Sequence, residues 1–330
     1  MTTTPTRSPQ GAEGLRRSRR SGVGSGLFAG LSVGSGALIL VVLAAVAAFL
    51  LIQAWPALTS APATLHESIA WFPDKTSLVS FVGPLVFGTL LAAAIALVIA
   101  TPIAVGIALF ISHYAPRRFA AGLGYLIDLL AAIPSVVYGL WGVRVLVGQN
   151  GIGQPIQQVL HDVLGFIPLF AGTPARPARS LFIAGMVLAV MILPIITAVA
   201  REVFLQTPRL HEEASLALGA TRWEMIRMAV LPFGRSGVVS AAMLGLGRAL
   251  GETMAVLMIL SPGFTYSWHI LEAGKQQTIA ANIAAQFPEA NPLGVNTLIA
   301  TGLALFVITL AVNMLARWIV SRRAEFSGAN

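Results

Sequence analysis

Long apolar segments alternate with shorter polar ones along the whole chain. Six segments are apolar over about the 20 residues that an α-helix needs to cross a bilayer. They are residues 29–52, 84–111, 121–146, 181–200, 236–260 and 295–316. Because lipid cannot satisfy exposed backbone polar groups, each segment is expected to be helical. The pattern therefore predicts an all-α membrane protein with six transmembrane helices.

Composition and charge support this fold class and predict its orientation. The chain is 56% hydrophobic and 10% charged, whereas a soluble domain carries roughly 25% charged residues. Fifteen of its 21 basic residues fall on one side of the predicted spans: Arg7, Arg16, Arg17, Arg19, Arg20, Arg117, Arg118, Arg201, Arg209, Arg222, Arg227, Arg235, Arg317, Arg322 and Arg323. Cytoplasmic loops carry such an excess, so both termini are predicted to be cytoplasmic. The net charge of +8 then reflects topology and attraction to anionic lipid, with no nucleic-acid partner expected.

The same pattern divides the chain into regions. Residues 1–25 are rich in Ser, Thr, Gly and Arg and are predicted to be a disordered basic cytoplasmic tail. Residues 26–80 hold the first transmembrane helix and an external loop. Residues 81–320 form the predicted core domain of five transmembrane helices, and residues 321–330 a second cytoplasmic tail.

Two classes of chemistry find no support in the residues present. The chain has no cysteine and its histidines are scattered, so neither disulfides nor a metal site are expected. Its only lysines, Lys75 and Lys275, lie outside any phosphate-binding glycine loop. The glycines Gly247 and Gly251 are instead expected to allow close helix contact. The chain is therefore predicted not to be an enzyme, and any ATP would be hydrolysed in another subunit.

The polar loop 201–235 is predicted to contain two short helices. Thr207 is expected to cap the first helix, with Pro208 at its first position, where a missing N–H costs nothing. Gly219 suits the left-handed conformation that ends a helix.

The second helix of this loop has a complete start signal. Thr221 and Glu224 have the spacing of a capping box, and Pro232 is expected to end the helix. The loop could be a solvated connector or a docking surface for a cytoplasmic partner. A DNA-reading helix-turn-helix is disfavoured because membrane spans hold both ends of the loop.

An arginine and a glutamate interrupt the fifth apolar segment. Arg248 and Glu252 are the only charged residues between Arg235 and His269. A charge near the bilayer centre costs about 2.5–3.5 kcal/mol even on a lenient scale, so such residues are functional candidates. On a continuous helix the two would share one face. They could line a transport pathway or merely hold the span to a neighbouring helix.

The third apolar segment carries weaker signals. Pro134 is predicted to kink its helix and free a carbonyl near Ser135, either along a pathway or at an ordinary packing bend. Asp128 and Arg144 are 16 residues apart, so they cannot pair and are expected to reach the two interfaces. Residues 154–164 have helical apolar spacing; they could lie in the interface plane or, as we favour, cover the external mouth.

Residues 211–232, HEEASLALGATRWEMIRMAVLP, resemble the EAA loop of ATP-binding-cassette (ABC) importer permeases. Five positions match the family's pattern: Glu213, Ala214, Gly219, Leu231 and Pro232. Ser215 and Ala229 depart from it by small changes. In that family the loop docks into the ATPase subunit and transmits its closure, which implies a type I ABC importer permease fold.

Three further stretches resemble the PstC family of phosphate-specific permeases: residues 131–142, 231–256 and 277–290. The resemblance covers roughly residues 80–320. It implies a PstA-like sister permease, a PstB-like ATPase dimer that uses ATP and Mg, and an extracytoplasmic PstS-like phosphate-binding protein. No cofactor is implied in this chain itself, and the implied location is the bacterial inner membrane.

The resemblance also implies that Arg248, Glu252 and Ser135 lie on a phosphate pathway. The guanidinium fork suits phosphate oxygens, and Glu252 could orient it while the pathway is empty. The carboxylate could also repel sulfate while accepting a hydrogen bond from protonated phosphate. A permease for another oxyanion such as molybdate or sulfate, an ion-coupled secondary carrier or channel, and a membrane scaffold remain alternatives.

Overall fold

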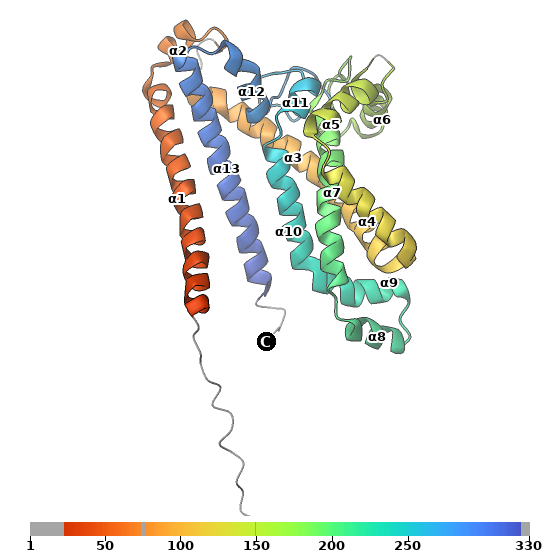
Figure 1. Ribbon diagram of the computed structural model, residues 1–330. Coiled ribbons are helices and arrows are strands. Elements are labelled where there is room, and N and C mark those ends of the chain that lie inside the picture. Colours follow the sequence, from red (N-terminus) through yellow and green to blue (C-terminus); the bar gives the residue numbers. More distant parts are fainter. Residues whose placement is uncertain (1–22, 74–76, 149, 325–330) are drawn as a thin grey trace, which may run out of the picture. The chain divides into compact units, whose positions relative to one another are not determined.

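The computed structural model describes residues 23–73, 77–148 and 150–324, which fall into two compact units divided after Phe49. Throughout these residues the regular structure is helical, apart from one isolated antiparallel bridge between Ser180 and Ala273. The first unit is the greater part of helix α1 (Val23–Thr59). All other elements belong to the second unit (Figure 1).

Among the described residues, five helices are long and apolar enough to cross a membrane. They are α1, α3 (Leu78–Leu109) with the π-turn η1 (Phe110–Tyr114), α7 (Leu181–Leu205), the run Arg222–Leu250, and α13 (Pro292–Ala324). A sixth candidate is a bent pair, α4 (Arg117–Ala131) and α5 (Ser135–Gly142), the latter continued by the π-turn η2 (Val143–Val147). The prediction of an all-α membrane fold is confirmed.

Helices α3 and α7 form the centre of the second unit and are its most extensive packing pair. Small residues line the α3 side of this contact: Ala92, Ala93, Ala96, Ala100 and Ala104 are all buried. A Cβ on Gly185 of α7 would lie only 2.6 Å from Cγ2 of Ile95. Small side chains let the two backbones approach closely, which is how membrane helices gain packing energy. Helices α4 and α10 pack against α7 as well.

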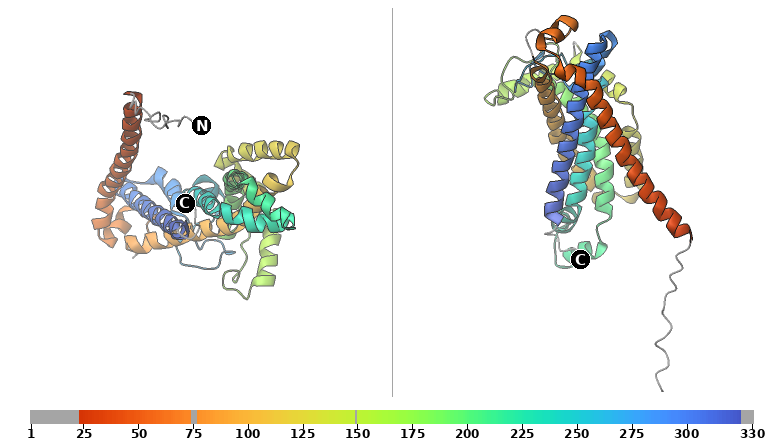
Figure 2. Two further views of the ribbon diagram at one scale, coloured as in Figure 1. Left: turned by 90° about the horizontal axis from the view of Figure 1, so that it is seen from below. Right: turned by 90° about the vertical axis from the view of Figure 1, so that its left-hand side faces the viewer.

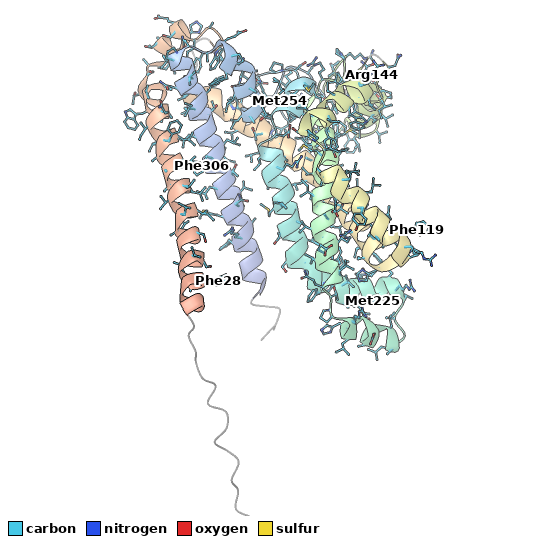
Figure 3. All side chains as sticks on the ribbon, in the orientation of Figure 1. Phe28, Phe119, Arg144, Met225, Met254 and Phe306 are labelled. Carbon is cyan, nitrogen blue, oxygen red and sulfur yellow. The ribbon has the colours of Figure 1, made fainter. Side chains whose placement is uncertain are left out.

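The remaining elements lie at the two ends of this helical unit (Figures 1 and 2). They are α2 (Pro62–Ser68), α6 (Gly153–Leu164), α8 (Arg209–Ala217), α11 (Met254–Ile259), α12 (Ile279–Gln286) and the 3₁₀ turn η4 (Phe287–Glu289). Figure 3 shows Met225 near the α8 end and Met254 near the α12 end. Helix α6 confirms the predicted helix at 154–164, whose place relative to the interface stays a prediction.

Candidate substrate pathway and coupling site

The fifth apolar segment is not one helix, so the expected continuous span over 236–260 is wrong. Helix α10 (Leu231–Leu250) ends before Gly251, and α11 begins at Met254. In the gap, the Oε1 atom of Glu252 accepts a hydrogen bond from the N–H of Ala255 at 3.0 Å. A side chain that accepts from an N–H in the first turn of a helix lowers the cost of starting that helix, so α11 can begin separately from α10.

This break changes the relation between the two charged residues. Glu252 lies outside both helices, so it does not share a helical face with Arg248, and no ion pair joins them among the described contacts. Glu252 is only 8% exposed and caps α11. The expectation that it orients the guanidinium is therefore corrected for this conformation.

Arg248 is half-buried and makes no hydrogen bond or ion pair with another described residue. It lies in the last turn of α10. The partial negative charge at a helix C-terminus favours a cation there. The guanidinium donors of Arg248 are consequently available to an anion at this break.

The third span breaks as well, with α4 and α5 bent by 89°. Pro134 lies at this break, directly before α5, and Ser135 is the half-buried first residue of α5. A proline in a helix cannot donate to the carbonyl four residues earlier; here that carbonyl belongs to Leu130. That oxygen accepts instead from the Tyr138 hydroxyl at 2.8 Å and from the N–H of Ile133 at 3.3 Å. Asp128 and Arg144 lie on the two separate arms and do not pair.

The two breaks converge because α5 packs directly against α11. A Cβ on Gly139 would lie 3.0 Å from the Cα atom of Ala255. Tyr138 was missed from the sequence, although a tyrosine four residues after a proline is a usable signal. Backbone ends and an aromatic hydroxyl thus lie close together between two broken spans, and Arg248 is in the last turn of the helix that leads into one of the breaks.

Buried polar side chains surround the start of α12, another group missed from the sequence. The N–H of Ile279 donates to Oγ1 of Thr89 on α3 at 3.0 Å, and Asn282 Nδ2 donates to Gln277 Oε1 at 3.4 Å. A Cβ on Gly88 would lie 2.2 Å from the Gln277 carbonyl oxygen, so only glycine fits there. The backbone of the loop before α12 is therefore in direct contact with α3, within its membrane-spanning length.

The loop at the opposite end contains the predicted pair of short helices, α8 and α9 (Arg222–Met225). The capping box is confirmed, since Thr221 N–H donates to Glu224 Oε2 at 2.8 Å and Glu224 N–H to Thr221 Oγ1 at 3.3 Å. Gly219 has φ +88°, which confirms the left-handed exit.

Two local predictions for this loop are wrong. Thr207 does not cap α8, because the helix begins at Arg209 after an extended Pro208, and Thr207 Oγ1 is buried without a partner among the described atoms. Pro232 does not end the second helix either. Helix α9, the π-turn η3 (Ile226–Val230) and α10 run on continuously, with Pro232 at the start of α10, where the wider π-turn precedes it.

A groove of about 720 Å³ lies between α8 and the start of the long helix. Its lining is mostly apolar and includes Ala214, Leu218, Gly219, Met228 and Phe233. The predicted coupling residue Glu213 is exposed on the same helix, whereas Leu231 and Pro232 do not line the groove. The groove thus contains Ala214 and Gly219 of the predicted set and adds the apolar side chains of Leu218, Met228 and Phe233.

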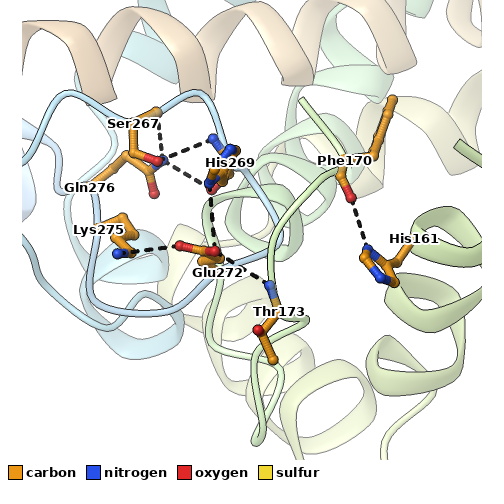
Figure 4. A network of polar contacts seen from close by, with 8 residues as sticks. All are labelled: His161, Phe170, Thr173, Ser267, His269, Glu272, Lys275 and Gln276. Atoms are coloured by element: carbon orange, nitrogen blue, oxygen red, sulfur yellow. Dashed lines mark hydrogen bonds and ion pairs between the residues drawn. The ribbon is translucent and has the colours of Figure 1, made fainter. Parts of the chain in front are cut away.

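The loops at the α12 end are held together by a polar network (Figure 4). Glu272 lies 3.5 Å from His269 Nδ1 and 3.4 Å from Lys275 Nζ, and its Oε1 accepts from the N–H of Thr173 at 3.3 Å. His161 on α6 contacts the Phe170 carbonyl at 3.2 Å. These contacts tie the loop before α7 to the loop before α12.

Comparison with known proteins identifies the family of this fold and site. Residues 100–325 match the family described as "Binding-protein-dependent transport system inner membrane component". The chain is 44% identical over 316 residues to "Phosphate transport system permease protein PstC 2" of Mycobacterium tuberculosis, covering 94% of this chain and 95% of that protein. The chain belongs to the PstC family.

Other PstC proteins are similar in sequence to this chain over most of their length. The Mycobacterium leprae protein is 45% identical over 284 residues, covering 84% of this chain and 88% of its own. The Haemophilus influenzae protein is 38% identical over 295 residues, covering 88% and 91%. Residues 131–142, 231–256 and 277–290, which suggested this family, contain both helix breaks and the start of α12.

The fold of this PstC-family chain matches a solved ABC importer. The "bacterial ABC transporter involved in the import of the acidic polysaccharide alginate" gives a TM-score of 0.51 at 16% identity, covering 88% of this chain and 97% of that one. This likeness concerns the fold alone. It confirms the predicted type I ABC importer permease architecture.

Proposed function

We propose that this chain is the permease subunit of an ATP-driven importer that carries inorganic phosphate into the cytoplasm. One observation carries the proposal. The capped helix start beside the docking groove and Arg248 lie on one uninterrupted helix, Arg222–Leu250. At about 1.5 Å per residue, they are roughly 40 Å apart along it. A movement imposed at Thr221 would therefore reach the break without crossing a flexible joint.

Phosphate would bind at the break through Arg248. Its fixed N–H donors match phosphate oxygens, and a guanidinium keeps its proton when partly desolvated. Discontinuous helices are a recurring way to present backbone groups and charges inside a membrane protein. Glu252 would then hold the start of α11 and disfavour a fully ionised anion such as sulfate, while Ser135 lies at the facing break.

The partners of this subunit follow from the same scheme. A PstB-like ATPase dimer, which hydrolyses ATP with Mg, would occupy the groove beside Glu213. A PstA-like sister permease would complete the pathway against α10, where Gly247 faces open space in this chain. A PstS-like binding protein would deliver phosphate at the α12 end. Both termini would be cytoplasmic in a bacterial inner membrane, in keeping with the basic residues around α8.

Vesicles that contain the chain with its ATPase and sister permease test this function. Radiolabelled phosphate should accumulate only with ATP, and an ATPase whose P-loop lysine is replaced should abolish accumulation. Uptake driven by an ion gradient without ATP would identify a secondary carrier instead. Competition by sulfate or molybdate as strong as that by unlabelled phosphate would contradict the assigned substrate.

A further inference from the structure

Two adjacent glutamates on α8 have different surroundings. Glu213 is exposed, as expected of a residue that meets a partner. Glu212 points back toward its own chain, with its Oε1 atom 3.6 Å from Nε2 of His113. His113 lies in the π-turn η1 at the end of α3, and its side chain is only 8% exposed. This contact joins α8 to α3, which are far apart in sequence.

The His113 ring continues the contact into α3. Its Nδ1 atom lies 2.7 Å from Oγ of Ser112, and the same Oγ lies 2.8 Å from the carbonyl oxygen of Ala108. Four groups are thus in line: the Glu212 carboxylate, the imidazole, the Ser112 hydroxyl and the Ala108 carbonyl. The first and last of these groups only accept hydrogen bonds.

Counting protons shows that this line has two arrangements. Ser112 has one hydroxyl proton, and a neutral imidazole has one N–H. With neutral His113, two protons serve three contacts, so one contact has no donor. With protonated His113, Nε2 donates to Glu212, Nδ1 to Ser112, and Ser112 to Ala108, so every contact has a donor. Only when His113 is protonated do His113 and Glu212 also form an ion pair.

The line borders a cavity of about 660 Å³ through which water and protons can reach it. The other titratable or charged groups that line this cavity are Tyr125, Asp128, Arg201 and Arg209. Arg201 forms an ion pair with Glu202, whose Oε1 atom lies 2.6 Å from Nη2 of Arg201. Among the described residues, Glu212 is the acid that lies within ion-pair distance of His113.

We propose that Glu212, His113 and Ser112 form a proton-sensitive link that transmits movement of α8 to α3. Protonated His113 is the tight form, because all three contacts then have donors. Helix α3 also contacts the start of α12, because Thr89 accepts from the N–H of Ile279. A displacement of α3 at η1 would therefore also move α12 at the other end of the unit. Histidine is the side chain whose charge ordinarily changes near neutral pH. This link rests on the proposed function, in which α8 meets the ATPase.

The test uses the reconstituted complex with the pH varied on the ATPase side from about 6 to 8. Phosphate taken up is divided by ATP hydrolysed. The wild-type ratio should fall as the pH rises. His113→Ala and Glu212→Gln should each lower the ratio at acidic pH by roughly two- to fivefold, the value of one ion pair, and flatten its pH dependence. Glu289→Gln removes an exposed carboxylate at the α12 end of the protein and should keep the wild-type slope.

A reversed pair separates the link from a simple loss of structure. His113→Glu combined with Glu212→His should restore much of the ratio and its pH dependence. Thermal unfolding of the purified complexes gives a second measurement. The effects of His113→Ala and Glu212→Gln should be more strongly non-additive at acidic than at alkaline pH.

The outcomes distinguish the two proposals. If the wild-type complex takes up no phosphate with ATP, the proposed function fails. If it transports and both single variants keep the wild-type ratio and slope, only the link is overturned. Equal non-additivity of the two substitutions at both pH values would also overturn it.

Discussion

Proline lies within the unbroken central helices α3 and α7 and at the break of the third span, but is absent from the break of the fifth span. Pro102 and Pro194 lie inside helices that continue past them, whereas Pro134 lies at an 89° break. The fifth span breaks at Gly251–Thr253 with no proline nearby. Proline content alone therefore does not decide where a span of this protein breaks.

Side-chain partners for the backbone mark the broken spans. At one break the Tyr138 hydroxyl serves the Leu130 carbonyl, and at the other the Glu252 carboxylate serves the Ala255 N–H. The central helices are instead packed closely along small residues such as Ala96 and Gly185. A span can break in a membrane only where something replaces the lost backbone bonds. In this chain one replacement directly follows the helix that ends with Arg248, and the other lies on α5, which packs against α11.

The largest expected effect comes from the unpartnered arginine. Arg248→Ala should lower ATP-driven phosphate uptake by roughly 10- to 150-fold, because a hydrogen bond to a charged group contributes about 1.5–3 kcal/mol. Vesicle uptake measures this, with co-purification of the ATPase as proof of assembly. Arg144→Ala removes an exposed arginine from the other broken span and should lower uptake far less. Similar reductions in uptake for the two variants would show that Arg248 has no special role in the pathway.

Filling the contact between the two breaks should have the next largest effect. Gly139→Leu must displace Ala255 or Met258, both 3.0 Å from an added Cβ, and overpacking of this kind costs about 1–3 kcal/mol. We expect a lower Tm of the purified protein and weaker uptake. Gly106→Ala on continuous α3 adds a Cβ that meets no atom within 4 Å, so it should leave the Tm unchanged or higher. A larger fall in Tm for Gly106→Ala than for Gly139→Leu would contradict this prediction.

The glutamate cap should have a moderate effect on stability that can be separated from its charge. Glu252→Ala removes the acceptor for the Ala255 N–H and should cost about 1 kcal/mol, as for other helix caps. Glu252→Gln keeps an acceptor oxygen, so its Tm should stay close to wild type while sulfate competition for uptake increases. If Gln and Ala lowered the Tm equally, the charge and not the cap would stabilise the break.

The smallest expected effect is at the third-span break. Tyr138→Phe removes the closer of the two donors to the Leu130 carbonyl and should cost about 0.5–1.5 kcal/mol, seen as a lower Tm. Tyr125→Phe on α4 removes a hydroxyl from a side chain that is 79% exposed and should have almost no effect. Equal Tm values for the two variants would show that the Tyr138 hydroxyl does not stabilise the break.

Much of the fold was predictable because the signals are local. The apolar runs predicted the spans that α3, α7 and α13 form, and the Thr221–Glu224 spacing predicted a capping box that the structure contains. The predictions for Thr207 and Pro232 were wrong because neighbouring residues changed the local conformation. Extended Pro208 moves the start of α8 away from Thr207, and the π-turn η3 lets the helix continue through Pro232.

The candidate site was only partly predictable. An ionisable pair in an apolar segment singled out Arg248 and Glu252, but helical periodicity placed them on one face. No feature within the segment showed that Glu252 would turn to the Ala255 N–H. The choice involves helices far apart in sequence, since α11 packs against α5.

By itself the sequence determined the membrane class, the number of apolar segments, the capped loop and the residues that needed an explanation. These follow from hydropathy, charge and capping, which act over a few residues. Only the tertiary structure decided that two spans break, that Arg248 has no hydrogen-bond or ion-pair partner among the described residues, and that Glu212 meets His113. Such pairings join residues far apart in the chain. Their energies depend on distances that no local pattern encodes.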